Sequence, residues 1–223
     1  MCMSLRIEPK EMAEVLIKVR KMAFAQEMSV KLGKSLIMSG DLYPSDIAPV
    51  LAPNKYGQMA IFPMAWGFTH KATPKPLANC RVETADTKAL WKDSWFRRRC
   101  VIPASWYYEW GYPVYEDDNR SMVEHRSTKK IKFAIQTEGS DITYIAGLYR
   151  YEEHCDMQVP MFTVLTKEAV GTVRDIHDRM PVILDKEDVK KWIRPDGDPR
   201  SIAEKALTNM VFETAVEYHR SLL

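Results

Sequence analysis

The sequence lacks long hydrophobic runs and any recognisable export signal. No apolar stretch approaches the ~20 residues that a membrane-spanning helix needs. The chain begins Met-Cys-Met-Ser-Leu-Arg, which has neither the cationic region nor the apolar segment of a secretion signal. We therefore expect a protein that stays in the cytoplasm and does not enter a membrane.

A large excess of charge of either sign is also missing. Lysine and arginine number 32 and aspartate and glutamate 30, which gives a formal net charge of +2. This balance excludes a protein that coats nucleic acid over its whole surface by electrostatic attraction. It still permits a local basic groove, because a groove needs only a few well-placed cations.

Cysteine is sparse, and its spacing fits no metal site. The four cysteines are Cys2, Cys80, Cys100 and Cys155. They form no CxxC pair, and no Cys/His group has the spacing of a zinc site. In a cytoplasmic protein of this size we expect them to be free thiols.

Repeats, low-complexity tracts and obvious linkers are absent from the sequence as well. A length of 223 residues suits one domain with a sizeable core, so we predict a single domain spanning 1–223. The strands that the sequence predicts follow one another as hairpin-like runs rather than alternating with helices. This order predicts an α+β fold with a curled, barrel-like antiparallel β core flanked by short helices.

Hydrophobic periodicity and helix-end residues locate the individual elements. Helices are predicted at 9–28, 86–96 and 186–193, the last capped by Asp185, and another short helix opens at Pro199. Strands are predicted at 58–68, 100–110, 131–135, 142–151 and 161–165, with a further strand at the C-terminal end. Segments 33–53 and 114–130 are predicted to be loops, because proline and glycine punctuate the first and polar residues fill the second.

The position of Cys2 gives it a chemistry that the other cysteines do not have. Once the initiator methionine is removed, Cys2 carries a thiol and a free α-amine on adjacent carbons. An aldehyde condenses with the amine to an imine, and the thiol then closes a five-membered thiazolidine ring in a favourable intramolecular step. Both kinds of group react near neutral pH, at roughly 7.7–8.0 for an α-amine and about 8.5 for a thiol. Position alone also allows the simpler interpretation that Cys2 has no role.

Three further segments concentrate residues with catalytic or phosphate-binding chemistry. They are Asn79-Cys80-Arg81-Val82-Glu83-Thr84, the run from Arg98 to Trp110, and Asp175-Ile176-His177-Asp178-Arg179-Met180-Pro181-Val182-Ile183-Leu184. Each allows a purely structural interpretation: Asn79 as a turn residue, Glu109 as the partner of an arginine, and His177 as a core histidine. Because aromatic residues surround Glu109 in the sequence, we expect its pKa to be raised.

Together these segments resemble the SOS response-associated peptidase (SRAP) family in their order and spacing. The resemblance rests on Cys2, Trp66-Gly67, the segments from Asn79 to Thr84 and from Arg98 to Trp110, and Thr166 followed by Ile176 to Pro181. It is specific between about residues 58 and 185, where the Tyr-Tyr-Glu-Trp and His-Asp-Arg-Met-Pro segments lie. Before and after that region it is weak apart from Cys2.

The resemblance implies a protein that recognises abasic sites in single-stranded DNA and bonds to them covalently through a thiazolidine. Cys2 is then the nucleophile, and Glu109 acts as a general acid/base on its amine or imine. His177 protonates the ring oxygen as the sugar opens, and Asn79 orients the sugar or the amine. No metal or cofactor is required, and we expect a monomer.

The resemblance also implies a set of DNA contacts, made up of four basic residues, a threonine and a tryptophan. They are Arg81, Thr166, Trp66, Lys71, Arg98 and Arg99. Two departures from the family pattern alter this set. Met3 and Ser4 replace the usual glycine and arginine after the cysteine, and Phe68-Thr69-His70-Lys71 replaces a segment in which relatives carry a proline and tryptophans. We therefore expect DNA binding that is weaker or differently arranged.

Two other functions remain open from the residues. One is an N-terminal-nucleophile cysteine peptidase or amidase, including autoprocessing, in which Cys2 attacks an amide and its own amine is the base. The other is a non-catalytic single-strand binding module, in which Arg97-Arg98-Arg99 and the aromatic residues form a stacking groove and Cys2 is idle.

Overall fold

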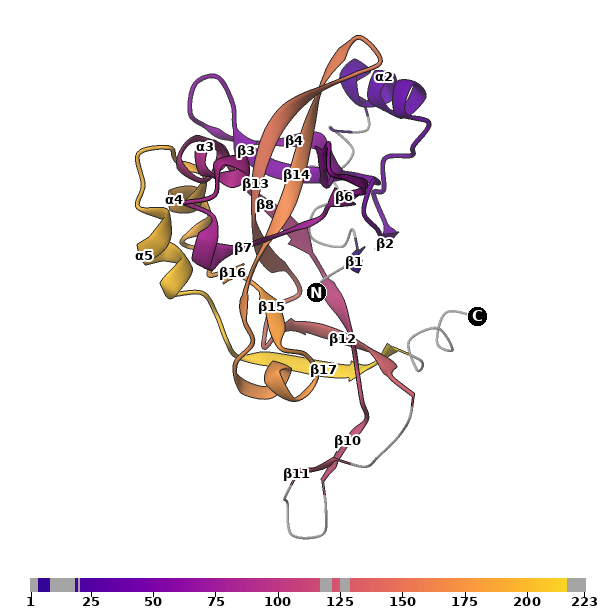
Figure 1. Cartoon of the computed structure of the whole chain (residues 1–223), viewed down its shortest axis with the longest axis vertical. Coiled ribbons are helices and arrows are strands. Elements are labelled where there is room, and N and C mark those ends of the chain that lie inside the picture. Colours follow the sequence, from indigo (N-terminus) through magenta and orange to yellow (C-terminus); the bar gives the residue numbers. More distant parts are fainter. Residues whose placement is uncertain (1–3, 9–18, 20, 117–121, 125–128, 216–223) are drawn as a thin grey trace.

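The computed structural model describes residues 4–8, 19, 21–116, 122–124 and 129–215, and strands dominate it (Figure 1). The first part of the chain forms β1 (Ser4–Ile7), α2 (Ala23–Leu32), β2 (Gly40–Leu42), β3 (Ile47–Pro53), β4 (Met59–Trp66), β5 (Phe68–His70), β6 (Thr73–Leu77), β7 (Asn79–Arg81) and the 3₁₀ helix η1 (Val82–Thr84). The second part forms α3 (Ala89–Arg97), β8 (Arg99–Ala104), β9 (Trp106–Gly111), β10 (Val114–Glu116), β11 (Met122–Glu124), β12 (Ile131–Thr137), β13 (Thr143–His154), β14 (Met157–Glu168), η2 (Gly171–Asp175), β15 (Arg179–Pro181), β16 (Ile183–Leu184), α4 (Val189–Ile193), α5 (Pro199–Glu204) and β17 (Met210–Thr214).

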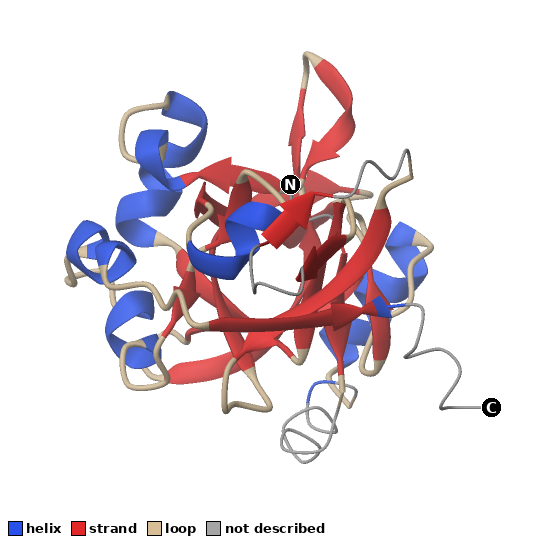
Figure 2. Cartoon of the chain, turned by 90° about the horizontal axis from the view of Figure 1, so that it is seen from below, coloured by secondary structure: helices blue, strands red, loops and turns tan. Residues whose placement is uncertain are grey.

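Five of these strands close into a barrel. β14 pairs with β4 on one side and with β13 on the other, β13 pairs with β8, and β3 joins β8 to β4. The pairing of β14 with β4 is parallel, as is that of β14 with β7, and the rest are antiparallel. Figure 2 shows the strands around the centre of the molecule with helices outside them. The predicted α+β fold with a barrel-like core is confirmed, although the barrel is mixed rather than wholly antiparallel.

A second sheet, in the order β17-β12-β9-β1-β2, packs against the barrel. Its residues Leu5, Tyr107 and Phe133 belong to the same buried cluster as Ile102 and Phe162 of the barrel. This cluster forms because alternate residues of each strand point inward. The molecule therefore has one main core shared by the barrel and the five-stranded sheet.

The helices cover the outer surface of the barrel. Trp95 of α3 and Trp192 of α4 form a second buried cluster with the outward-facing barrel residues Val101 and Leu148. The two indole rings meet edge to face, with centroids 5.9 Å apart. Burial of these large aromatic surfaces fixes the helices on the barrel.

The prediction of a loop at 33–53 is wrong, because this segment contains β2 and the barrel strand β3. Pro49 of β3 lies opposite Pro63 of β4. Neither proline can donate a backbone hydrogen bond to the other, so the pair suits a position of an antiparallel ladder without cross-strand hydrogen bonds. Proline content alone therefore predicted a loop where tertiary pairing forms a strand.

The strand predicted at 100–110 is in fact two strands that belong to different sheets. β8 lies in the barrel, and the chain turns at Ser105 into β9 of the five-stranded sheet. The N–H of Ser105 donates to the carbonyl of Arg6 (2.8 Å), and its Oγ accepts from the N–H of Glu8 (2.9 Å). Contacts with the distant β1 segment thus produce a break that local sequence does not reveal.

Helix bounds differ from the predicted ones, and one predicted loop contains strands. Most of the helix predicted at 9–28 lies outside the described residues. Its last part belongs to α2, which continues to Leu32, and α3 and α4 begin later than predicted. Asp185 does not cap α4, because its carboxylate accepts from the N–H of Glu187 in the preceding turn (2.8 Å). The described parts of 114–130 pair as β10 and β11, a hairpin that projects from the body of the molecule (Figure 1).

The remaining predicted elements are confirmed. β4 and β5 occupy the strand predicted at 58–68, with a break at Gly67. β12 and β14 contain the strands predicted at 131–135 and 161–165, and β13 covers all but the first residue of the strand predicted at 142–151. α5 opens at Pro199, and β17 is the C-terminal strand.

Candidate functional site

Glu109 is a buried carboxyl group on β9, with only 3% of its surface exposed. It shares a face of the strand with Tyr107 and Gly111, while Tyr108 and Trp110 alternate to the other face. Burial disfavours the charged carboxylate and raises the pKa of Glu109 to about 7. The direction agrees with the expectation from the sequence, but its cause is burial in the fold rather than the adjacent Tyr108 and Trp110, and a raised pKa suits a group that exchanges protons near neutral pH.

His177 follows η2 and faces Glu109, with 3.8 Å between its Nε2 and the Oε2 of Glu109. Its Nδ1 accepts a hydrogen bond from the backbone N–H of Arg179 (3.0 Å) and also lies 2.7 Å from a carboxylate oxygen of Asp178. The backbone N–H of Arg179 needs an unprotonated Nδ1, whereas the Asp178 carboxylate needs a proton on Nδ1, so the two contacts favour different tautomers of the ring. Burial lowers the pKa of His177, which favours the neutral form of the ring.

A glycine allows β9 and η2 to approach closely enough for this pair to form. A Cβ at Gly111 would lie 2.7 Å from the carbonyl oxygen of Ile176 and 2.8 Å from its Cγ2. Because Ile176 directly precedes His177, a side chain at position 111 would push the histidine away from Glu109. Gly111 was not among the predicted site residues, and its place two residues after Glu109 is the only sequence signal for it.

An ion pair connects the Asn79–Thr84 segment to the His177 segment. The guanidinium of Arg179 donates to both carboxylate oxygens of Glu83 (2.8 and 2.9 Å) and to the carbonyl of Thr166 (2.8 Å). Arg179 holds the pKa of the Glu83 carboxyl below its ordinary value. The backbone N–H of Arg179 donates to the ring of His177. The Glu83–Arg179 ion pair therefore helps to orient the histidine.

Strand β7 brings Asn79 and Arg81 to the same region. Asn79 lies opposite Val164 and Arg81 opposite Thr166 on β14, and Thr166 also pairs with Pro181 of β15 on its other side. Alternation along β7 buries Cys80 and leaves Arg81 exposed on the opposite face. Three segments that are distant in sequence therefore meet across β14.

The described chain begins beside this cluster. Ser4 of β1 pairs with Tyr108, the residue before Glu109. Cys2 itself lies outside the described residues. The first described residue of the chain therefore lies on the strand next to β9.

Two predicted DNA contacts, Trp66 and Thr166, are buried inside the molecule. Trp66 is 0% exposed, donates from Nε1 to the carbonyl of Ala78 (2.9 Å) and stacks on Phe162. Thr166 is also 0% exposed, and its hydroxyl donates to the carbonyl of Cys80 (3.5 Å). Neither side chain can reach a phosphate, so their assignment as DNA contacts is wrong, and both contribute to barrel packing.

The assignment of Arg99 as a DNA contact is wrong for a different reason. Its guanidinium is buried and donates to the carbonyls of Trp95 in α3 (2.7 Å) and Trp192 in α4 (2.6 Å). The last carbonyls of a helix have no partner within the helix and carry partial negative charge. Arg99 thus caps two helix ends at once and is unavailable to DNA.

Lys71 and Arg98 lie away from the Glu109–His177 pair. Lys71 is exposed in the turn between β5 and β6 and lines a cavity there. Arg98 follows α3 in the helical layer and forms an ion pair with Asp93. The structure therefore does not combine the predicted cations in one groove.

The cysteines inside the described part of the chain are free thiols, as predicted, and two of them are buried. Burial raises the pKa of Cys80 to about 12 and that of Cys100 well above its ordinary value, so both are unreactive near neutral pH. Cys155 is exposed. Within the described residues, no group of three or more histidine, cysteine or acidic residues could hold a metal ion. No helix in that part of the chain is long and apolar enough to cross a membrane.

A family of proteins matches nearly the whole sequence. The sequence model described as "SOS response associated peptidase (SRAP)" matches residues 1–220. The abasic site processing protein YoaM of Bacillus subtilis (strain 168) is 32% identical over 120 residues, which cover 53% of this chain and 48% of that protein. The abasic site processing protein YedK of Escherichia coli (strain K12) is 26% identical over 158 residues, which cover 70% and 65%. The chain spans about half the length of the first relatives it matches.

Solved structures share the fold at lower sequence identity. A protein from Bacteroides thetaiotaomicron superimposes with a TM-score of 0.68 at 18% identity, covering 96% of this chain and 91% of the other. A protein from Bordetella bronchiseptica gives a TM-score of 0.68 at 19% identity, covering 96% and 99%. These likenesses support the fold alone.

Proposed function

The chain belongs to the SOS response associated peptidase (SRAP) family, and from this we propose that it binds abasic sites in single-stranded DNA and bonds to them through Cys2. Relatives from bacteria to vertebrates carry the name abasic site processing protein. An abasic sugar exists partly as an open-chain aldehyde, which matches the chemistry of an N-terminal cysteine. Removal of Met1 exposes the amine that this chemistry needs.

The observation that carries the proposal is the proximity of the amino-terminal strand to a buried proton-exchanging pair. Ser4 pairs with Tyr108, next to Glu109, and Glu109 faces His177 across 3.8 Å. The pKa of Glu109 is raised to about 7 and that of His177 is lowered, in both cases by burial. Two such groups exchange protons at neutral pH, as condensation of an amine with an aldehyde requires.

In the proposed reaction the amine of Cys2 attacks C1′ of the open sugar, and loss of water leaves an imine. The thiol then adds to the C=N carbon and its proton passes to nitrogen, which closes the thiazolidine. Glu109 accepts the amine proton and returns it when water leaves. The imidazolium form of His177 gives a proton to the sugar ring oxygen as the ring opens, and the anomeric hydroxyl returns a proton to the imidazole.

Other polar residues of the region are proposed to hold the DNA. Asn79 orients the sugar or the amine, and the exposed Arg81 binds a neighbouring phosphate. Lys71 and Arg98 remain proposed phosphate contacts at greater distance along the strand.

A single experiment tests the proposal. Purified protein is incubated with a single-stranded oligonucleotide that carries one abasic site and is analysed on a denaturing gel. We expect a covalent complex with wild type and with Cys155→Ala, which removes the exposed thiol, and none with Cys2→Ala. Reversible DNA binding by Cys2→Ala should be nearly unchanged, and intact-mass measurement should show that the reactive form begins at Cys2. Full crosslinking by protein that retains Met1 contradicts the mechanism.

The family name supports a peptidase as the alternative, with Cys2 attacking an amide and its own α-amine serving as the base. Turnover of a peptide panel without any DNA complex would favour this alternative. DNA binding that is unchanged in Cys2→Ala, with no covalent product from wild type, would instead favour a non-catalytic binding module.

A further inference from the structure

The ring of His177 has two contacts at Nδ1 that require different protonation states. The backbone nitrogen of Arg179 lies 3.0 Å from Nδ1, and its N–H donates only to an unprotonated nitrogen. A carboxylate oxygen of Asp178 lies 2.7 Å from the same Nδ1, and it accepts only when Nδ1 carries a proton. The neutral ring with its proton on Nε2 suits the first contact, and the imidazolium suits the second. The ring therefore has a partner at Nδ1 in both protonation states.

The backbone around the ring is fixed, so only a side chain can respond to the charge of the ring. The N–H of His177 donates to the carbonyl of Val173 (2.9 Å), and the carbonyl of Asp178 accepts from the N–H of Ala169 (2.9 Å). Arg179 is anchored by its two-fold hydrogen bond to a carboxylate. The Asp178 side chain, in contrast, is 84% exposed and is free to turn toward the ring or away from it. Asp178 is therefore the partner that adapts.

Among the described residues, charged or titratable groups lie around the ring on three elements. Glu109 faces Nε2 from β9 at 3.8 Å, Asp178 and Arg179 directly follow the histidine, and Lys130 precedes β12. Burial lowers the pKa of His177 and Lys130 lowers it further, whereas Asp178 raises it. The pKa of Glu109 is about 7, so below that pH Glu109 is mostly neutral. Asp178 then supplies the negative charge that a protonated ring needs.

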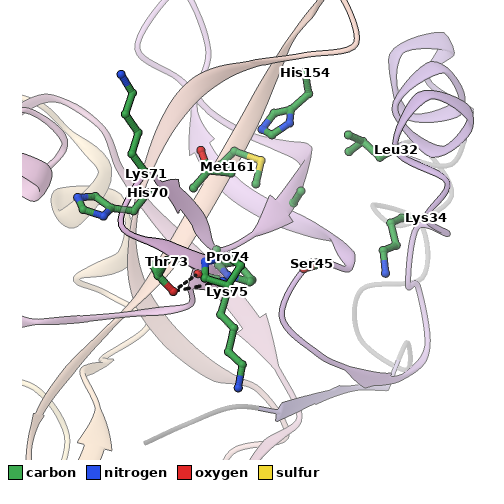
Figure 3. Close-up of a pocket in the computed structure, with 14 residues that line it drawn as sticks. Leu32, Lys34, Ser45, His70, Lys71, Thr73, Pro74, Lys75, His154 and Met161 are labelled. Atoms are coloured by element: carbon green, nitrogen blue, oxygen red, sulfur yellow. Dashed lines mark hydrogen bonds between the residues drawn. The ribbon is translucent and has the colours of Figure 1, made fainter.

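A second histidine–carboxylate pair shows what distinguishes this one. His154 of β13 lies at the edge of a cavity of about 430 Å³ between the β5–β6 hairpin and the end of α2 (Figure 3), with Nε2 3.3 Å from Oε2 of Glu152. The Glu152 carboxylate also accepts from the N–H of Thr69 (3.0 Å) and pairs with Arg150 (2.8 Å), so it is satisfied without the histidine. Within the described part of the chain, the Asp178 carboxylate contacts only the imidazole beside it. Its charge is therefore directed at one ring.

We propose that Asp178 is a positioning residue for proton transfer in the proposed reaction, and that its carboxylate holds the proton on Nδ1 of His177 while Nε2 gives up and regains a proton. The inference rests on the proposed function, since it assumes that His177 protonates the sugar. In that step the Nε2 proton passes to O4′, the C1′–O4′ bond breaks, and the anomeric hydroxyl returns its proton to Nε2 as the aldehyde forms. The contact with Asp178 stabilises both the cation and the tautomer that is left after Nε2 has given its proton.

The first test compares Asp178→Asn with wild type in single-turnover crosslinking of an abasic single strand between pH 5 and pH 8. The asparagine keeps the shape of the side chain and removes its charge. The ring becomes protonated in both proteins as pH falls, so their rates should converge at low pH. At pH 8 the variant should be about fivefold slower, the upper size of the effect of an ion pair with an exposed partner. Its melting temperature should match that of wild type for the same reason.

Glu168→Gln is the matched control for the loss of one negative charge. Glu168 is exposed on β14 opposite Arg179, and its side chain makes no contact with the ring in the described structure. This variant should crosslink at the wild-type rate at every pH. An equal loss in Glu168→Gln, or a loss in Asp178→Asn that does not depend on pH, overturns the role of Asp178.

Two further measurements separate this role from a purely structural one. In ¹⁵N-resolved titrations of the free protein, the midpoint of His177 should fall in Asp178→Asn, while the signals of His154 should be unaffected. An oligonucleotide that carries an acyclic aldehyde in place of the abasic sugar needs no ring opening, so wild type and Asp178→Asn should crosslink to it at equal rates. In a His177→Gln background, Asp178→Asn should have no further effect, because it acts through the histidine.

The outcomes distinguish this inference from the proposed function. Failure of wild type to form any covalent complex overturns the proposed function and the role of Asp178 with it. Normal crosslinking by wild type, with an unchanged pH profile in Asp178→Asn, overturns the role of Asp178 alone. An equal loss with the acyclic aldehyde, or an unchanged midpoint of His177, does the same.

Discussion

At the scale of single residues, the site depends on burial, which favours the neutral forms of both Glu109 and His177. Burial raises the pKa of Glu109 and lowers that of His177, so both groups can be neutral near pH 7. The Arg179 N–H and the Asp178 carboxylate both contact Nδ1 of His177, while Nε2 faces Glu109. Reactivity therefore follows from position, since either residue on an open surface would titrate in its ordinary range.

The first prediction concerns the rate of covalent bond formation. His177→Gln and Glu109→Gln should each slow single-turnover crosslinking by roughly 10²–10⁴-fold, because each removes one general acid/base. The affinity for DNA should change little, since neither side chain is proposed to hold a phosphate. Single-turnover kinetics at saturating protein and a melting curve for each variant make the comparison. Wild-type rates in both variants would show that the pair is structural.

The second prediction concerns the Glu83–Arg179 ion pair. Glu83→Gln weakens both hydrogen bonds to the guanidinium and should slow crosslinking by roughly 10–100-fold, the size of one lost charge-assisted hydrogen bond. Imidazole ¹⁵N chemical shifts should show that the tautomer balance of His177 changes. Asp196→Asn, which breaks the exposed pair with Arg194, is the matched control and should alter neither measurement. An unchanged tautomer in Glu83→Gln would remove this pair from the orienting network.

At the scale of elements, the site requires two close approaches between strands and turns. The turn at Ser105 carries the chain from the barrel into the five-stranded sheet and so directs β9 toward η2. Gly111 then lets β9 contact Ile176 without a side chain between them. The backbone of these two elements, rather than long side chains, sets the separation of Glu109 and His177.

The third prediction tests that separation with Gly111→Ala. The added methyl group meets the carbonyl of Ile176, so η2 should shift and crosslinking should slow by at least tenfold, with a stability loss of about 1–3 kcal/mol. Gly147→Ala is the control, because its Cβ also meets atoms at close range (Ile102 Cδ1 at 2.6 Å) but in the barrel interior. It should lower the melting temperature without a comparable effect on the rate of the folded protein. Equal effects of both variants on the rate would contradict the role of Gly111.

At the scale of the whole molecule, the candidate site lies where the barrel and the five-stranded sheet meet. Glu109 belongs to the sheet, whereas β7, β14 and β15 carry the other segments from the barrel side. Packing of the two sheets into one hydrophobic cluster excludes water from the carboxyl group. The same packing that stabilises the fold therefore creates the raised pKa of Glu109.

The fourth prediction is a pH dependence of stability. The folded-state pKa of Glu109 is about 7, above the ordinary value of 4.5, so between these values the folded protein holds a proton that the unfolded chain releases. Its stabilising contribution is complete below pH 4.5 and is lost as pH rises through 7, by up to about 3 kcal/mol for a shift of this size. Glu109→Gln removes this loss, so its melting temperature relative to wild type should be higher at pH 8 than at pH 5. His177 has a lowered pKa and the opposite sign, and His177→Gln serves as the comparison. A pH-independent difference for Glu109→Gln would contradict the raised pKa.

The sequence by itself determined which chemical groups are available and much of the strand content. Alternation of Ile131, Phe133 and Ile135 predicted β12, because one face of that strand is buried in the core. Aromatic neighbours predicted the raised pKa of Glu109, and motif order predicted the family. The role of Cys2 is still a prediction, since it lies outside the described residues.

Only the tertiary structure decided which polar side chains face solvent and which distant segments meet. Trp66, Thr166 and Arg99 have the chemistry of DNA contacts, yet closure of the barrel buries the first two and the ends of α3 and α4 bind the third. Periodicity gives the face of a strand on which a residue lies but not what packs against that face. For the same reason, the approach of Gly111 to Ile176 and the bonds between Arg179 and Glu83 could not be predicted, because they join residues that the chain separates by more than 60 positions.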